Sequence, residues 1–311
     1  MKKIELLVLL LFFVPLFCGF TEIPIKAQSP FEDVTVDVPY ITMPQKDIEK
    51  ILEMAQVGPD DLLYDLGSGD GRIVIAAAEK RGARGVGVEI DGELVRESRR
   101  KAKRANVQDR VEFIESDLFK VDFSKATVVT LYLMPDLNLR LRPTLLSMPP
   151  GTRVISHSWD MGEWQPDEAV FTPSLTVRMF PDKKFRRSKI HLWIIPADIR
   201  GNWHWREVDG KTLGSLRINQ RFQEAEGTLT DGAGESPATV EIKGDWVRIT
   251  PKDGQGGKSL PILEGRVDGG VINGTATYKD GTQAKSFPWK AFRQPETMTS
   301  VEKQGRKKSP M

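Results

Sequence analysis

Residues 62–72 read LLYDLGSGDGR, an apolar run that ends in an aspartate and is followed by three alternating glycines. Gly67, Gly69 and Gly71 let the backbone turn sharply and let a ligand lie against bare main chain. A dinucleotide-binding fingerprint would need glycine where the chain has Arg72, and a Walker-type loop would need a lysine followed by a hydroxyl residue. The stretch therefore predicts a strand, a ligand-binding turn of another class, and a helix.

Acidic residues stand at the ends of three successive predicted strands. Asp65 precedes the glycines, where it would repel a pyrophosphate but suits a cationic amino-acid group. Glu89 occupies the place of a carboxylate that accepts ribose hydroxyls in doubly wound folds. Asp117 ends the third strand, where a carboxylate can accept from an adenine amino group. Because open α/β sheets bind ligands at the carboxyl ends of their strands, these residues predict one ligand site.

The segment around these motifs alternates short apolar runs with helical stretches, which predicts an α/β fold with a Rossmann-like, doubly wound, mostly parallel seven-stranded sheet. The expected strands are Asp61–Asp65, Gly85–Glu89, Val111–Ile114, Thr127–Leu133 and Arg153–His157. The expected helices are Gly71–Lys80, Gly92–Ala105 and Leu137–Ser147. Two more apolar runs, Leu175–Phe180 and Ile190–Ile195, are expected to form an antiparallel hairpin that closes the sheet edge.

The character of the chain changes after Pro196. Sixteen of the 27 glycines lie beyond residue 200, and Asp-Gly pairs typical of tight hairpins recur there. Alternating apolar residues between the turns predict a small all-β domain over 201–293, either a barrel or a sandwich. The polar, Lys-rich tail 294–311 is expected to be disordered.

The N-terminus has the layout of a targeting segment. Lys2 and Lys3 precede an apolar run from Leu6 to Phe20, so residues 1–27 are expected to be a signal peptide or an N-terminal membrane anchor. The positive residues should stay inside, which predicts an exported protein, periplasmic or extracellular, or a membrane-anchored one. A cytosolic position of the folded part also stays open.

Together, residues 65–71, Glu89 and residues 116–118 make the chain resemble the class I, seven-stranded, S-adenosylmethionine-dependent methyltransferases. Through residues 38–44, 65–74 and 133–138 it resembles the protein-lysine methyltransferases that act on the ATP synthase c-subunit, with their bacterial relatives. The resemblance implies a methyltransferase domain over 38–197 and S-adenosyl-L-methionine as cofactor. The cofactor-binding residues implied are Asp65, Gly67, Ser68, Gly69, Gly71, Glu89, Ile90, Asp117 and Leu118.

Methyl transfer from a sulfonium mainly requires the acceptor to be aligned and dry, and a lysine acceptor must be neutral. Aromatic residues at strand ends could line such a channel, and a histidine there could relay a proton. The candidates for the acceptor site are Tyr40, Tyr132, His157 and Trp159, each also compatible with ordinary packing.

Composition limits the other partners. The net charge is +2, so no global field draws the chain to nucleic acid, and the single cysteine, Cys18, argues against a cysteine-based metal site. Six basic residues within 96–104 are expected on a solvated helix face. We therefore expect a protein substrate, with membrane proteins among the candidates, and we expect no nucleic acid and no metal.

Two other functions remain open at this point. A non-catalytic exported binding protein on a methyltransferase-like scaffold would fit the export signal, because S-adenosylmethionine is a cytosolic metabolite. A small-molecule methyltransferase would fit the same cofactor residues, because fold does not fix substrate. The combination of Asp65, Glu89 and Asp117 favours an enzyme, and among enzymes a protein-lysine N-methyltransferase.

Overall fold

The computed structural model describes residues 42–174, 188–207, 212–231, 234–252, 260–280 and 283–294. The predicted N-terminal signal or anchor, the strand expected at Leu175–Phe180 and residues 295–311 of the predicted tail lie outside the described residues. Within the described part of the chain, no helix has both the length and the apolar character needed to cross a membrane.

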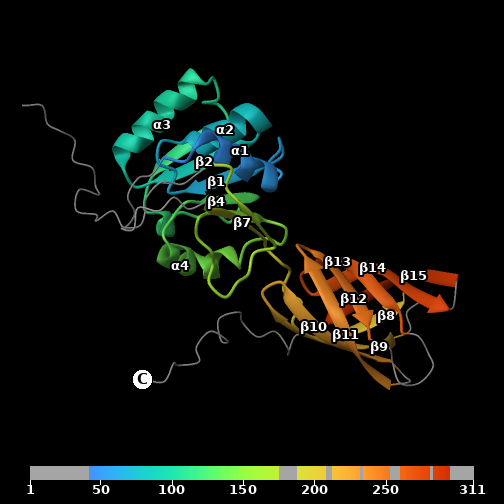
Figure 1. The fold of residues 1–311 in the computed structure, drawn as a ribbon. Coiled ribbons are helices and arrows are strands. Elements are labelled where there is room, and N and C mark those ends of the chain that lie inside the picture. The colour runs from blue at the N-terminus through green and yellow to red at the C-terminus, as the bar shows by residue number, and fades with distance from the viewer. Residues whose placement is uncertain are drawn as a thin grey trace, which may run out of the picture. The chain divides into compact units, whose positions relative to one another are not determined.

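The first half of the described chain forms a seven-stranded sheet in the order β3-β2-β1-β4-β5-β7-β6 (Figure 1). The strands are β1 (Leu62–Leu66), β2 (Arg84–Glu89), β3 (Val111–Glu115), β4 (Val128–Leu131), β5 (Arg153–His157), β6 (Glu168–Phe171) and β7 (Lys189–Ile194). Strands β1 to β5 are parallel, while β7 runs antiparallel to both β5 and β6. This is the predicted doubly wound, mostly parallel sheet.

One strand of this sheet was not predicted. The edge strand β6 lies at Glu168–Phe171, ahead of the run that was expected to begin the closing hairpin. Its residues are mostly exposed, and Phe171 is 60% exposed. A short edge strand of this kind has no buried alternating pattern, so periodicity gives no signal for it.

Four helices within the described ranges cover the two faces of this sheet (Figure 1). They are α1 (Gln45–Met54), α2 (Arg72–Arg81), α3 (Gly92–Arg104) and α4 (Pro135–Leu145), and a short 3-10 turn, η1, spans Leu118–Lys120. Helices α1, α2 and α3 share a core cluster with Leu63 and Ile155, whereas α4 shares another with Leu66 and Val154. Because strand residues alternate between faces, Asp65 and His157 lie on the face of α1 to α3.

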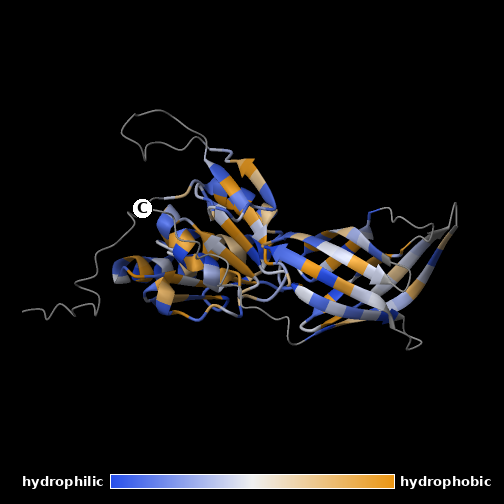
Figure 2. Ribbon diagram, turned by 90° about the horizontal axis from the view of Figure 1, so that it is seen from below, coloured by the Kyte–Doolittle hydropathy of each residue, from blue (hydrophilic) through white to orange (hydrophobic). Residues whose placement is uncertain are grey.

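The second half is a closed antiparallel barrel in the order β10-β11-β12-β13-β14-β15-β8-β9. Its strands are β8 (Gly201–Glu207), β9 (Thr212–Arg221), β10 (Glu224–Asp231), β11 (Gly234–Lys243), β12 (Trp246–Pro251), β13 (Ile262–Asp268), β14 (Val271–Asp280) and β15 (Gln283–Arg293). Hydrophilic and hydrophobic residues alternate along these strands (Figure 2), and Trp203, Trp205 and Trp289 are buried in its core. Closure decides between the two predicted forms in favour of a barrel and leaves no free sheet edge.

Gly71 offers a direct test of the sheet's first turn. Its φ is +76°, and a Cβ added there would lie 2.6 Å from Phe113 Cε1. We expect Gly71→Ala to destabilise the protein by at least ~2 kcal/mol, from the left-handed backbone and the clash together. Urea unfolding measures this, with Gly58→Ala as the control because nothing lies within 4 Å of its added Cβ. Equal unfolding midpoints for the two variants would contradict the prediction.

Candidate functional site

The glycine turn after β1 is held by the carboxyl end of β2. The amide groups of Gly67 and Ser68 both donate to the carbonyl oxygen of Val88, at 2.8 and 2.9 Å. The amide of Gly69 donates to Glu89 Oε2 at 2.8 Å. Three consecutive N–H groups of the turn are therefore satisfied by β2, and the turn has its shape before any ligand arrives.

Glu89 accepts two further backbone hydrogen bonds. Its Oε1 receives the amides of Ile90 at 2.8 Å and Asp91 at 3.0 Å. A carboxylate has about four acceptor positions, so three bonds leave about one, on Oε2. One ribose hydroxyl can bind there directly, and a second would have to replace the Ile90 or Asp91 donor. The ribose contact of Glu89 stays a prediction with this constraint added.

Asp65 is a buried carboxylate with one strong partner. It is 2% exposed, and the Thr130 hydroxyl on β4 donates to its Oδ1 at 2.6 Å. Burial raises the pKa of Asp65 to about 7; the Thr130 hydrogen bond opposes this rise, and the nearby carboxylates of Glu89 and Asp70 add to it. An approaching cationic amino group would stabilise the ionised form, which is the chemistry predicted for Asp65.

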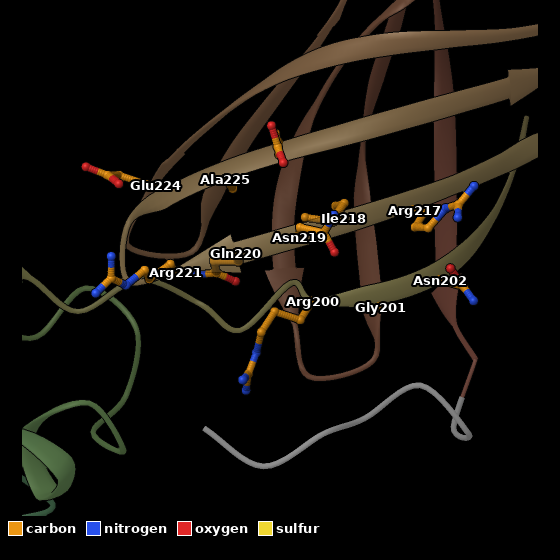
Figure 3. Close-up of a pocket in the computed structure, with 11 residues that line it drawn as sticks. Arg200, Gly201, Asn202, Arg217, Ile218, Asn219, Gln220, Arg221, Glu224 and Ala225 are labelled. Atoms are coloured by element: carbon orange, nitrogen blue, oxygen red, sulfur yellow. The ribbon is translucent and has the colours of Figure 1, made fainter. Parts of the chain in front are cut away.

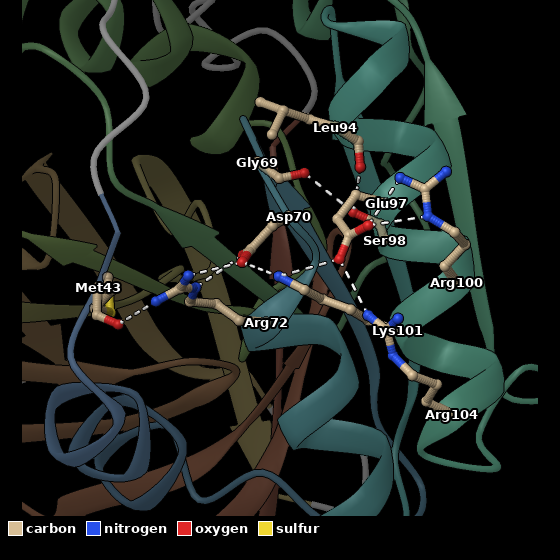
Figure 4. Close-up of polar contacts among 10 residues, drawn as sticks. All are labelled: Met43, Gly69, Asp70, Arg72, Leu94, Glu97, Ser98, Arg100, Lys101 and Arg104. Atoms are coloured by element: carbon tan, nitrogen blue, oxygen red, sulfur yellow. Dashed lines mark hydrogen bonds and ion pairs between the residues drawn. The ribbon is translucent and has the colours of Figure 1, made fainter.

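A second carboxylate of the turn, Asp70, is neutralised from two directions (Figure 4). Arg72 donates to both of its oxygens at 2.7 Å, and Lys101 of α3 forms an ion pair with its Oδ2. Burial alone would raise the pKa of Asp70, but the hydrogen bonds and charges of Arg72 and Lys101 outweigh it, and the pKa is lowered. Arg72 also donates to the Met43 carbonyl at 2.9 Å, which ties the start of α1 to the turn.

This network adds residues that were not predicted. Five of the six basic residues of α3 that were expected on a solvated face are exposed, whereas Lys101 is half-buried and lies against the turn. The exposed Arg99 donates to the Phe113 carbonyl at 2.7 Å. The sequence analysis treated Asp70 only as part of the glycine turn, because its partners Arg72 and Lys101 lie on two separate helices. The one sequence signal for the Lys101–Asp70 ion pair is that Lys101 precedes Ala102, which is on the buried face of α3.

Several predicted cofactor residues have structural roles that are visible without a ligand. The Ser68 hydroxyl is buried without a hydrogen-bond partner among the described residues, and the Ser68 carbonyl accepts from the Gly71 amide at 3.0 Å. Asp117 Oδ1 accepts from the Phe119 amide at 2.9 Å and thereby caps η1, while Leu118 is packed at the edge of the α4 core. Direct contacts of Ser68, Gly71, Asp117 and Leu118 with cofactor stay predictions.

Two predicted acceptor-site residues come together at the carboxyl ends of β4 and β5. The rings of Tyr132 and His157 are 4.4 Å apart and meet edge to face. His157 is fully buried, and burial lowers its pKa although Asp47 opposes this. Trp159 follows two residues later and is partly buried, with its carbonyl accepting from Asn138 at 3.3 Å. Tyr40 lies outside the described residues.

The barrel carries a separate cavity of about 610 Å³ along β8, β9 and β10 (Figure 3). Its lining mixes charges of both signs, with Arg217 on one strand and Glu224 and Glu226 on the next. Arg217 already pairs with Glu235 at 3.2 Å. Among the residues that the structure describes, no group of three or more His, Cys, Asp or Glu side chains could hold a metal ion.

A doubly wound sheet with a glycine turn after β1 and carboxylates at the ends of β1 and β2 is the arrangement expected for the class of S-adenosylmethionine-dependent methyltransferases. Residues 65–168 match the family described as the ANTKMT methyltransferase domain. The chain is 42% identical over 135 residues to a protein-lysine N-methyltransferase of Saccharolobus islandicus, across 43% of this chain and 84% of that protein. The chain belongs to this protein-lysine N-methyltransferase family.

Other relatives match over less of their length. The mouse lysine N-methyltransferase of the ATP synthase c-subunit is 39% identical over 135 residues, 42% of this chain and 53% of that protein. The mouse adenine nucleotide translocase lysine N-methyltransferase is 32% identical over 149 residues, 48% of this chain and 61% of that protein. A solved structure described as an RNA methyltransferase of Salinibacter ruber with S-adenosyl-L-homocysteine is 48% identical, with a TM-score of 0.46, over 51% of this chain and 96% of that one.

The raised pKa of Asp65 predicts a pH-dependent affinity for S-adenosylhomocysteine, which carries the same amino-acid group as the cofactor. If Asp65 pairs with that group in its ionised form, as predicted, binding below about pH 7 must first remove a proton from Asp65. We expect Kd to rise about tenfold per pH unit as the pH falls below 7 and to level off above it. Isothermal titration calorimetry at several pH values from about 5.5 to about 8.5 measures how this Kd depends on pH.

Asp65→Asn is the matched control, because the Thr130 hydroxyl can still donate to an amide oxygen. Its affinity should be weak and independent of pH. The folded state binds the Asp65 proton more tightly than the unfolded state, so this carboxylate costs stability as the pH rises from about 4 to about 7. Asp65→Asn should therefore also unfold at a higher temperature than wild type at pH 8. If the affinity of the wild-type protein for S-adenosylhomocysteine did not change with pH, Asp65 could not be the partner of the ligand's amino group.

Proposed function

We propose that this protein transfers a methyl group from S-adenosylmethionine to the ε-amino group of a lysine in a protein partner. One observation carries the proposal. The glycine turn that Glu89 holds and the Asp65 carboxylate before it lie at the carboxyl ends of the parallel strands, and the Tyr132–His157 pair lies at the same ends. Family membership supports the lysine acceptor, since the relatives are named for lysine N-methylation.

The roles of the chain's own residues follow from this geometry. When bound, the cofactor supplies an electrophilic methyl group and its own leaving group. Asp65 binds the amino-acid end, and Glu89 binds the ribose, so together they fix the direction along which the methyl group points. Positioning of two reactants in this way can supply ~7–11 kcal/mol of the barrier, so a dedicated catalytic triad is not required. Partly buried aromatic residues such as Tyr132 exclude water and favour a neutral amine.

We propose further that the partner is a membrane protein. Relatives are named for the ATP synthase c-subunit and for adenine nucleotide translocase, and the apolar run before residue 21 would hold this protein at a membrane.

The proposal predicts a missing modification in a deletion strain. Mass spectrometry of the membrane fraction should find a lysine that carries added methyl groups in the wild type and after complementation, but not after complementation with Asp65→Asn. Thr130→Val is unsuitable as a control because Thr130 contacts Asp65; Tyr64→Phe, on the opposite face of β1, should restore the modification. Methylation found only in RNA or only in small metabolites would contradict a protein-lysine acceptor.

A separate proposal concerns the compartment: residues 1–27 direct export or an outward-facing anchor. Alkaline phosphatase and green fluorescent protein, fused after Tyr40, report opposite sides of the membrane. We expect phosphatase activity without fluorescence. Fluorescence without phosphatase activity would place the folded part in the cytosol, overturn the export proposal and remove the difficulty of reaching a cytosolic cofactor. Export of a protein that binds no cofactor would favour the non-catalytic alternative.

A further inference from the structure

Ser158 is the first residue after β5, and its side chain turns back onto the residue before it. Its Oγ lies 2.9 Å from Nδ1 of His157. Successive side chains of a strand point to opposite faces, so this contact requires the backbone to leave the strand conformation at Ser158. It does so with a φ of +73°, which is unusual for a residue that has a side chain. The strand therefore ends in a conformation that brings a hydroxyl and an imidazole together.

Contacts from β7 and α4 hold this conformation. The Ser158 amide donates to the Lys189 carbonyl at 2.8 Å. Asn138 Nδ2 on α4 lies 3.3 Å from the carbonyl oxygens of both Trp159 and Asp160, which fixes the residues that follow. Strained backbone that the surrounding structure maintains occurs preferentially at functional sites. The contact between the two side chains therefore indicates a functional role.

The second ring nitrogen of His157 faces a buried carboxylate. Asp47 Oδ2 on α1 lies 3.3 Å from His157 Nε2, and both side chains are fully buried. The other oxygen of Asp47 accepts from the Ser174 amide at 3.0 Å. A proton on Nε2 satisfies the carboxylate, and burial lowers the pKa of His157, which favours a neutral ring. Nδ1 then carries a lone pair and accepts from the Ser158 hydroxyl.

Ser158 is the member of this group that a substrate can reach. It is partly exposed, whereas the other two side chains are fully buried. Strands β4 and β5 pair with Leu131 opposite Ser156, so the residues that follow the two strands leave the sheet side by side. Leu133 after β4 packs on the cofactor turn, because its Cδ2 lies 2.8 Å from where a Cβ on Gly67 would be. Ser158 lies one strand further along the same edge, where an acceptor would approach the predicted cofactor.

We propose that Ser158 takes a proton from the substrate lysine and passes its own hydroxyl proton to His157, so that the amine is neutral for methyl transfer. The inference rests on the proposed function and deepens it by naming the base. One N–H bond of the lysine ammonium breaks, and its electron pair stays on nitrogen as the lone pair that attacks the methyl group. The lysine proton bonds to Ser158 Oγ while the hydroxyl proton bonds to His157 Nδ1, and Asp47 pairs with the imidazolium. After the product leaves, the proton returns through Ser158 to water.

The groups around His157 suit this role. Asp47 of α1 favours the imidazolium, and His191 of β7 disfavours it. The ring of Tyr132, after β4, meets the imidazole edge to face with 4.4 Å between the centroids and adds no charge while it is neutral. The Lys189 ammonium lies over an aromatic ring of the edge strand, 5.4 Å from its centroid. Asp47 is therefore the charged partner that stabilises a proton received by His157.

The pH dependence of methylation separates this role from a structural one. The acceptor is the membrane fraction of a deletion strain, and initial rates with methyl-labelled S-adenosylmethionine at limiting acceptor give kcat/KM. Ser158→Gly removes the hydroxyl, and glycine accepts the positive φ. We expect it to lower kcat/KM about a hundredfold near pH 7, as for lost general base catalysis. The loss should shrink about tenfold per pH unit and nearly vanish near about pH 9, because more lysine is then neutral in solution.

The controls test the relay itself. The affinity of Ser158→Gly for S-adenosylhomocysteine should equal that of wild type, and Ser147→Ala, an exposed serine on the same sheet face as α4, should behave as wild type. The variant that also carries His157→Gln should lose no more than Ser158→Gly alone, because the two residues act in one path. The same fractional loss at every pH in Ser158→Gly would overturn the inference and leave lysine methylation intact.

A spectroscopic measurement tests the relay without turnover. NMR of protein labelled with ¹⁵N-histidine should show neutral His157 with its proton on Nε2, with His191 and His204 assigned by substitution. A proton on Nδ1 of the neutral ring would overturn the inference, because that nitrogen could not accept from Ser158. A wild-type protein that methylates no lysine would instead overturn the proposed function, and the NMR result would still decide which nitrogen of His157 is the acceptor.

Discussion

The site depends on the contact between the end of β2 and the glycine turn after β1. Val88 accepts from Gly67 and Ser68, and Glu89 accepts from Gly69, so one strand end fixes three consecutive amides of its neighbour. The parallel pairing of the strands places these groups opposite one another, and the positive φ of the glycines makes the approach sterically allowed. A carboxylate that shapes the turn and also recognises the ribose would couple the fold directly to cofactor binding.

The surroundings of Asp70, in the glycine turn, and of Asp65, before it, shift the pKa values of the two carboxylates in opposite directions. Asp70 is neutralised by Arg72 and Lys101, which link the turn to α2 and α3 and so stabilise the structure. Asp65 has only a hydroxyl partner, and its pKa is raised. A buried carboxylate without a protein cation is unfavourable for the free protein, and it becomes favourable once a ligand brings a positive charge. The difference is the one expected between a structural carboxylate, Asp70, and a ligand-binding one, the role predicted for Asp65.

The sequence revealed the parts that depend on local pattern. Strand ends marked by Asp65 and Glu89 could be predicted because an apolar run with a fixed period stops at a charged residue. The Lys101–Asp70 and Asp47–His157 pairs could not, since their members are 31 and 110 positions apart and meet only after the helices pack. Strand β6 could not be predicted because its residues are mostly exposed and show no buried alternation. The choice between barrel and sandwich depended on closure of the sheet, which no single strand encodes.

The central claim is that Glu89 both shapes the turn and binds the cofactor ribose. Isothermal titration of wild type, Glu89→Ala and the exposed neighbour-strand control Glu112→Ala with S-adenosylmethionine tests it most directly. The account predicts one site in wild type and in Glu112→Ala, and an affinity at least about tenfold weaker in Glu89→Ala, because charge-assisted hydrogen bonds are lost. Circular dichroism should show that all three proteins are folded. No binding by wild type, or equal affinities for wild type and Glu89→Ala, would contradict the account.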